Sequence, residues 1–82
     1  MERFAFLKQL AMNYTTLPDD FTPDTPFTSI GMDSYDVVDF MLNVEEKFGI
    51  TADDEVILSM NCIRDVEELI KHCMKEDESN HA

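Results

Sequence analysis

Positive charge is scarce in this sequence, and the scarcity excludes several classes of function. Six Lys and Arg residues stand against 18 Asp and Glu residues among 82, so the formal net charge is -12 at pH 7. Such a chain repels the phosphates of nucleic acids and anionic lipid head groups. We therefore expect no nucleic-acid binding and no membrane insertion. The same self-repulsion disfavours the compact state, so the fold should gain stability with salt.

Cysteines and long apolar runs are also rare. Cys62 and Cys73 lie in one predicted helix, about 16 Å apart along its axis, which is too far for a disulfide bond. Neither a zinc-ligand spacing nor an EF-hand loop occurs, so we expect no dedicated metal site. The N-terminal region has no apolar run long enough for an export signal or a membrane span, which predicts a cytoplasmic protein.

The length and the spacing of apolar residues predict one small all-α domain over residues 1–75 and a polar C-terminal tail over residues 76–82. Apolar positions recur every three or four residues over 2–14, 33–48 and 62–74, and a short helical turn fits 53–58. All three prolines fall between the first two helices, which predicts a long loop there. The expected fold is a small bundle of three main helices plus one short helix.

Each predicted element has residues that we expect to face the core. In the first helix they include Leu7, Ala11 and Tyr14. The long loop contributes Leu17, Phe21, Phe27 and Ile30. The second helix has an apolar stripe of Val37, Val38, Met41, Leu42, Val44 and Phe48. The short helical turn and its continuation contribute Ile57, Leu58 and Met60.

The residues do not predict an enzyme, because no oriented base accompanies any nucleophile and no catalytic set is recognisable. The most informative segment is residues 30–39, where a Gly-containing turn leads to Ser34 at the start of an acidic helix. Ser34 has two interpretations. It is either a simple N-cap, or an exposed hydroxyl where unpaired backbone N–H groups and the helix dipole favour a bound phosphate.

This segment resembles the attachment motif of the acyl carrier protein family, usually Leu-Gly-x-Asp-Ser-Leu. The sequence there reads Ile30-Gly31-Met32-Asp33-Ser34-Tyr35, and it continues as Val44-Glu45-Glu46-Lys47-Phe48-Gly49-Ile50. The spacing then matches as far as Asp65 and Ile70. The similarity covers residues 27–70, and the combination of motifs is specific where Asp-Ser alone is not.

The resemblance implies that residues 1–75 form an acyl carrier domain without catalytic residues of its own. A phosphopantetheinyl transferase would attach 4′-phosphopantetheine from coenzyme A to Ser34, and acyl groups would be held as thioesters on the thiol of this arm. Gly31 would permit a close approach of the backbone, and Asp33 would help to hold the turn.

The resemblance also implies a docking surface on the helix after Ser34. Its residues are Asp36, Asp39, Glu45, Glu46 and Tyr35. No basic residue occurs between Lys8 and Lys47, so this region would attract basic surfaces of partner enzymes. We expect the partners to be the phosphopantetheinyl transferase and acyl-loading, synthase or transferase enzymes with basic patches. A monomeric carrier would bind these enzymes one after another.

Three departures from the family pattern bear on specificity. Tyr35 replaces the usual Leu, and Leu58 stands where many fatty-acid carriers have an acid. Ala52 stands where they often have a larger aliphatic residue, and this replacement would alter a cavity for the acyl chain. Fatty-acid synthesis and a specialised polyketide, lipid or peptide pathway both stay open. The alternative of another class is an unmodified acidic helical protein-interaction module.

Overall fold

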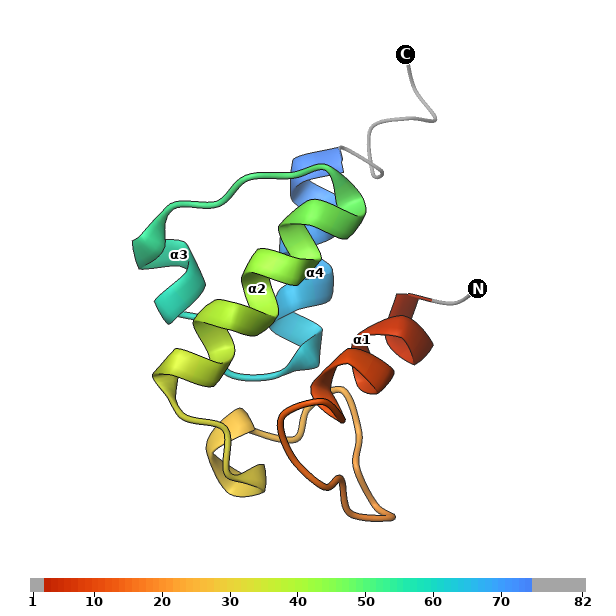
Figure 1. Ribbon diagram of the computed structural model, residues 1–82. Coiled ribbons are helices and arrows are strands. Elements are labelled where there is room, and N and C mark those ends of the chain that lie inside the picture. The colour runs from red at the N-terminus through yellow and green to blue at the C-terminus, as the bar shows by residue number, and fades with distance from the viewer. Residues whose placement is uncertain (1–2, 75–82) are drawn as a thin grey trace.

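Helices account for most of the 3–74 segment, which is the part of the chain that the computed structural model describes (Figure 1). In chain order they are α1 (Arg3–Ala11), the 3-10 helix η1 (Phe27–Ile30), α2 (Ser34–Phe48), α3 (Asp54–Leu58) and α4 (Ile63–Met74). No strand occurs within these residues. The predicted fold, three main helices and one short helix with a long loop after the first, is confirmed. The predicted tail, residues 76–82, lies outside the described residues.

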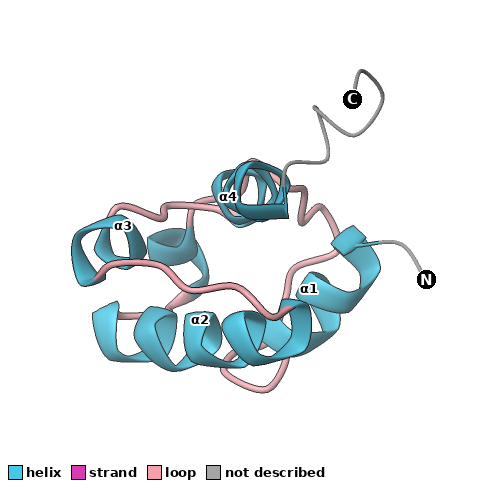
Figure 2. Cartoon of the chain, turned by 90° about the horizontal axis from the view of Figure 1, so that it is seen from above, coloured by secondary structure: helices cyan, strands magenta, loops and turns pink. Residues whose placement is uncertain are grey.

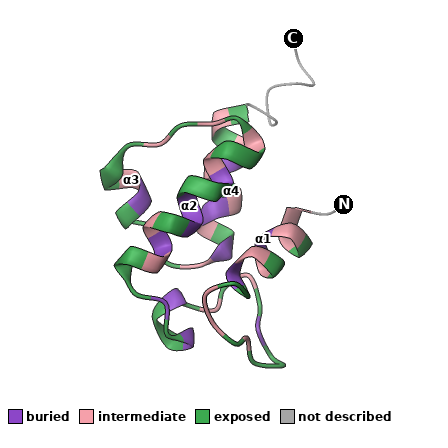
Figure 3. Ribbon diagram, in the orientation of Figure 1, coloured by how far each residue is buried: buried purple, intermediate pink, exposed green. Residues whose placement is uncertain are grey.

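The helices enclose one core, with α2 on one side and α3 and α4 on the other (Figure 2). α2 contacts both α1 and α3, and α1 also packs against α4. Buried positions line the inward faces (Figure 3). The fully or almost fully buried large side chains are Phe27, Phe40, Leu7, Met41, Ile63, Ile70, Val44 and Val66.

α1 is shorter than predicted, because the helix ends at Ala11 and the chain continues as turns. The Tyr14 and Thr15 amides both donate to the Ala11 carbonyl, at 2.9 and 3.2 Å. The ring of Tyr14 still packs edge-on against Phe40, with the ring centroids 6.3 Å apart. The apolar spacing therefore extends past the helix end, which explains the overestimate.

Both ends of α2 follow local signals in the sequence. Asp33 is the N-cap: its carboxylate accepts a hydrogen bond from the Asp36 amide at 2.9 Å, and the Asp36 carboxylate accepts one from the Asp33 amide at 3.3 Å. This reciprocal pair is a capping box. At the other end Gly49 has a φ of 67° and donates its N–H to the Glu45 carbonyl, a left-handed conformation that favours glycine.

The predicted stripe of α2 is wrong at two positions. Phe40 is completely buried although the prediction omitted it, whereas Leu42 is 53% exposed. The buried residues Val37, Phe40, Met41 and Val44 follow the spacing of one helical face, and Leu42 lies off that face. α2 is apolar on more than one side, so its pattern alone did not determine which side faces the core.

The long loop is held against the start of α4. Phe21, Phe27 and Ile30 are buried as predicted, and Leu17 packs against the core. The Phe27 amide donates to the Asn61 carbonyl at 2.7 Å, and the Arg64 amide donates to Pro23 at 2.8 Å. These bonds join segments that are far apart in sequence and hold the loop against the start of α4.

The Arg64 side chain adds an ion pair to this junction. Its Nε and Nη2 donate to the two carboxylate oxygens of Asp24, at 2.5 and 3.0 Å. The guanidinium holds the pKa of Asp24 below its usual range, mainly through these hydrogen bonds. Because both side chains are exposed to solvent, the pair orients the loop more than it stabilises the fold.

Candidate functional site

Ser34 is the first residue of α2 and is exposed to solvent. The capping position is taken by Asp33, so the serine is not the N-cap. Within residues 3–74 no group forms a hydrogen bond with the Ser34 hydroxyl. The first turn of a helix also presents unpaired backbone N–H groups and the positive end of the dipole, which suit a phosphate. The hydroxyl is thus accessible where an attached phosphodiester would be stabilised.

Gly31 and Asp33 hold the turn before Ser34, and the reason for the glycine differs from the one predicted. Gly31 has a φ of 85° and ends η1 with its N–H directed at the carbonyls of Phe27 and Thr28. A Cβ at this position would meet nothing closer than the Thr15 hydroxyl oxygen at 3.9 Å. Backbone conformation, rather than a close approach, therefore favours glycine here.

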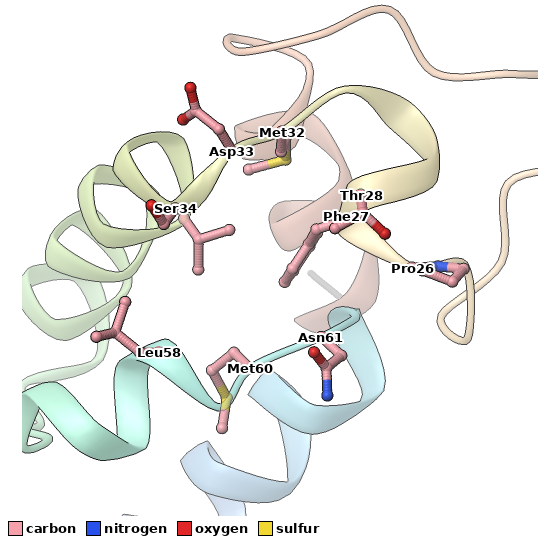
Figure 4. A pocket seen from close by; sticks show the side chains of 10 residues that line it. Pro26, Phe27, Thr28, Met32, Asp33, Ser34, Leu58, Met60 and Asn61 are labelled. Atoms are coloured by element: carbon pink, nitrogen blue, oxygen red, sulfur yellow. The ribbon is translucent and has the colours of Figure 1, made fainter.

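An apolar cavity of about 430 Å³ opens beside Ser34. Figure 4 shows Ser34 at its edge, with Leu58 of α3 and Met60 of the α3–α4 connection across the opening. Its inner walls include Phe27, Met32 and Val37, all of them buried. The size is within the range of small-molecule sites.

Two predictions about this cavity are wrong. Leu58 was expected in the core, but it is 59% exposed and lines the opening instead. Ala52 was expected to alter the cavity, but it does not line it; its amide donates to the Glu45 carboxylate at 2.7 Å. α3 has only five residues, and such a short segment does not reveal from its spacing which apolar residue faces inward.

The predicted docking residues lie along α2, and three of the four acids also have structural roles. Asp36 completes the capping box, Asp39 accepts a hydrogen bond from Tyr14, and Glu45 accepts one from the Ala52 amide. Glu46 is exposed and has no hydrogen-bond partner in the described region. The acids therefore differ in how firmly each carboxylate is held.

Tyr35 follows Ser34 and is 84% exposed, so its ring does not pack against the core. An aromatic ring exposed to this extent beside an accessible serine is available to a partner surface. Tyrosine is enriched at protein interfaces, because its ring buries a large area while its hydroxyl keeps a polar contact.

The polar role of Tyr14 and the whole contribution of Asn43 were not predicted from the sequence. The Tyr14 hydroxyl donates to Asp39 Oδ2 at 2.6 Å and accepts from Asn43 Nδ2 at 3.1 Å. Burial, followed by the hydrogen bond to Asp39, raises the pKa of Tyr14 to about 12. Only the i to i+4 spacing of Asp39 and Asn43 was visible beforehand, and nothing in the sequence connected that pair to Tyr14.

Comparison with known proteins agrees with this geometry. A family profile described as the phosphopantetheine attachment site matches residues 5–70. The chain belongs to the phosphopantetheine-binding carrier proteins. Members of this family hold 4′-phosphopantetheine covalently and act as carriers rather than catalysts. An exposed serine at a helix N-terminus, capped by its neighbour and bordered by an apolar cavity, fits that group.

The relatives of this carrier include plant acyl carrier proteins. It is 35% identical over 71 residues to the chloroplastic acyl carrier protein 1 of Casuarina glauca, which is 84% of this chain and 48% of that protein. The chain thus spans about half the length of the curated relatives it matches first. The resemblance to the acyl carrier protein family is confirmed.

Solved structures of carrier proteins have the same fold. The hexanoyl acyl carrier protein of the actinorhodin polyketide synthase from Streptomyces coelicolor matches with a TM-score of 0.74, 21% identity and 93% coverage of each chain. The acyl carrier protein of Thermotoga maritima matches with a TM-score of 0.72 and 20% identity, over 92% of this chain and 88% of that one.

Proposed function

We propose that Ser34 is the attachment site for 4′-phosphopantetheine and that the chain carries acyl intermediates on that arm. The observation that supports this most directly is the cap of α2. Asp33 satisfies the Asp36 amide, which leaves the exposed Ser34 hydroxyl available for esterification. A phosphopantetheinyl transferase would join this oxygen to the phosphate of coenzyme A and release adenosine bisphosphate. The bound arm supplies a terminal thiol for thioesters.

We also propose that the cavity beside Ser34 receives the acyl chain. Support comes from the apolar side chains that line it and from its opening next to the serine. An acyl chain that entered the cavity would be removed from water, which favours binding by roughly 0.8 kcal/mol per CH₂ group. Fatty-acid synthesis and a specialised polyketide, lipid or peptide pathway both stay open as the source of the cargo.

The partners of the carrier are proposed from the surface of α2. Asp36, Asp39, Glu45, Glu46 and Tyr35 would meet basic docking patches on the transferase and on acyl-loading, synthase or transferase enzymes. The chain itself would act as a monomer without catalytic residues. No helix among residues 3–74 has the length and apolar character to cross a membrane. The cytoplasmic location stays a prediction, since the plant relatives are named as chloroplastic proteins.

The decisive experiment is the intact mass of the protein after incubation with coenzyme A, Mg²⁺ and a broad-specificity phosphopantetheinyl transferase. We expect a gain of one phosphopantetheine, which Ser34→Ala abolishes. Ser29→Ala is the matched control, because Ser29 is an exposed serine near the site whose hydroxyl donates to Pro26; this variant should gain the full mass.

No gain by the folded wild-type chain would contradict the attachment proposal. Circular dichroism on the same sample confirms that the helices are present. The unmodified acidic interaction module would then become the better description of the protein, with α2 as its binding surface.

A further inference from the structure

The docking acids of α2 are not equally free to rotate, and Asp39 is held by a residue outside the helix. Tyr14 Oη donates to Asp39 Oδ2 at 2.6 Å. Asn43 Nδ2 donates to the same Tyr14 oxygen at 3.1 Å and to the Asp39 backbone carbonyl at 3.0 Å. These hydrogen bonds link the turn that follows α1 to the exposed side of α2.

The ring of Tyr14 is itself fixed in position. It packs edge-on against Phe40, at an interplanar angle of 71°, and Phe40 is completely buried. The Tyr14 amide donates to Ala11 in the last turn of α1, and the next residue, Thr15, donates its hydroxyl to the Ile30 carbonyl. The contact with Phe40 fixes the Tyr14 ring, and the hydrogen bonds of the Tyr14 amide and the Thr15 hydroxyl fix the backbone that carries it.

The hydroxyl of Tyr14 remains a donor under physiological conditions. The pKa of Tyr14 is raised to about 12, first by burial and then by the hydrogen bond and charge of Asp39. A protonated phenol can donate only one hydrogen bond, and here that bond goes to Asp39 Oδ2. Asp39 is nevertheless an exposed residue, and its Oδ1 has no hydrogen-bond partner in the described region.

We propose that Tyr14 is a positioning residue for docking: it holds the Asp39 carboxylate in one orientation, with Oδ1 presented to a Lys or Arg side chain of a partner enzyme. The inference rests on the proposed docking role of α2. A carboxylate that is already ordered loses less rotamer freedom when a partner binds, so the complex forms more readily. Glu46, exposed and without a hydrogen-bond partner among residues 3–74, lacks this arrangement.

The test is a double-mutant cycle on the rate of Ser34 modification by the transferase. Tyr14→Phe removes the hydroxyl and keeps the ring against Phe40. We expect it to lower kcat/KM by about threefold to tenfold at low salt through a higher KM, the change expected when one side chain must be ordered on binding. In the Asp39→Asn background the same substitution should have no further effect.

The matched control is the same cycle with Glu46→Gln, because Glu46 lies on α2 but does not contact Tyr14. Tyr14→Phe should retain its full effect in that background. An equal loss in the Asp39→Asn and Glu46→Gln backgrounds, or no loss in the wild-type background, would overturn the proposal. All rates are measured below the melting temperature of each variant, so a general loss of stability does not enter the comparison.

A second measurement does not depend on Ser34. Side-chain NMR couplings of Asp39 should indicate one χ1 rotamer in the wild-type chain and an average of rotamers in Tyr14→Phe. A single rotamer in both proteins would refute the positioning role. If the wild-type chain is not modified at all, the attachment proposal fails, while these couplings still decide whether Tyr14 orders Asp39.

Discussion

Asp33 and Ser34 are neighbours with different physical tasks. Asp33 accepts the Asp36 amide and so satisfies one of the unpaired donors at the start of α2. Ser34 is then not required for the helix, and its hydroxyl faces solvent. A carrier needs this division, because a serine whose oxygen capped the helix would have to give up that bond when it was esterified.

Asp33→Ala is therefore expected to destabilise the protein by about 1 kcal/mol, within the 0.5 to 2 kcal/mol typical of a lost N-cap. Ser34→Ala should change the free energy of unfolding by less than about 0.5 kcal/mol. Urea unfolding followed by circular dichroism measures both values. A larger loss for Ser34→Ala than for Asp33→Ala would mean that the serine, and not the aspartate, caps α2 in solution.

At the scale of the elements, the cavity results from the way short segments meet. Four short segments each contribute one wall of the cavity. They are η1, the first turn of α2, the end of α3 and the connection between α3 and α4. The hydrogen bond from the Phe27 amide to Asn61 links two of these walls directly. The exposed Leu58 leaves an apolar opening where many fatty-acid carriers have a charged residue.

If the acyl chain enters this cavity, the melting temperature should rise from the butanoyl to the hexanoyl and octanoyl carrier. Each sequestered CH₂ group contributes roughly 0.8 kcal/mol. Differential scanning calorimetry of the three loaded forms provides the measurement. Leu58→Asn, which changes an exposed residue, should reduce the increments and leave the unloaded form nearly unchanged. A flat series would place the chain in solvent.

For the whole molecule, charge is the dominant property. The formal charge of -12 acts on a domain whose radius of gyration is 12.7 Å, so many like charges lie within or near one Debye length at ordinary ionic strength. The few basic side chains are partly committed to contacts within the fold. Lys47 lies over the ring of Phe6, 5.2 Å from its centroid, and Arg64 pairs with Asp24.

The melting temperature should therefore increase as NaCl is raised from about 0.02 M to about 0.5 M, because screening weakens the self-repulsion. Asp20→Lys tests the cause, since Asp20 is exposed and the substitution changes the formal charge from -12 to -10. This variant should melt higher at low salt and respond less to NaCl. Thermal scans that do not depend on ionic strength would contradict the explanation.

Local features of the sequence determined the helices, the caps of α2 and the candidate serine. A capping box and a left-handed glycine depend on residues within a few positions of each other, so the signals at Asp33, Asp36 and Gly49 are local in the sequence. The sequence alone did not decide whether Asp33 or Ser34 is the N-cap. The Gly-x-Asp-Ser motif is equally local. The family was predictable for the same reason, because the motif and the residues around it are contiguous.

Tertiary structure alone decided the burial of Phe40, the exposure of Leu42 and Leu58, and which acids are held. Phe40 is buried and Leu42 is exposed because the face of α2 that carries Phe40 meets the rest of the bundle. Leu58 is exposed because α3 turns it toward the cavity opening. The bond between Tyr14 and Asp39 joins residues 25 positions apart. Such contacts depend on how separate helices pack, and the local sequence carries no direct record of that packing.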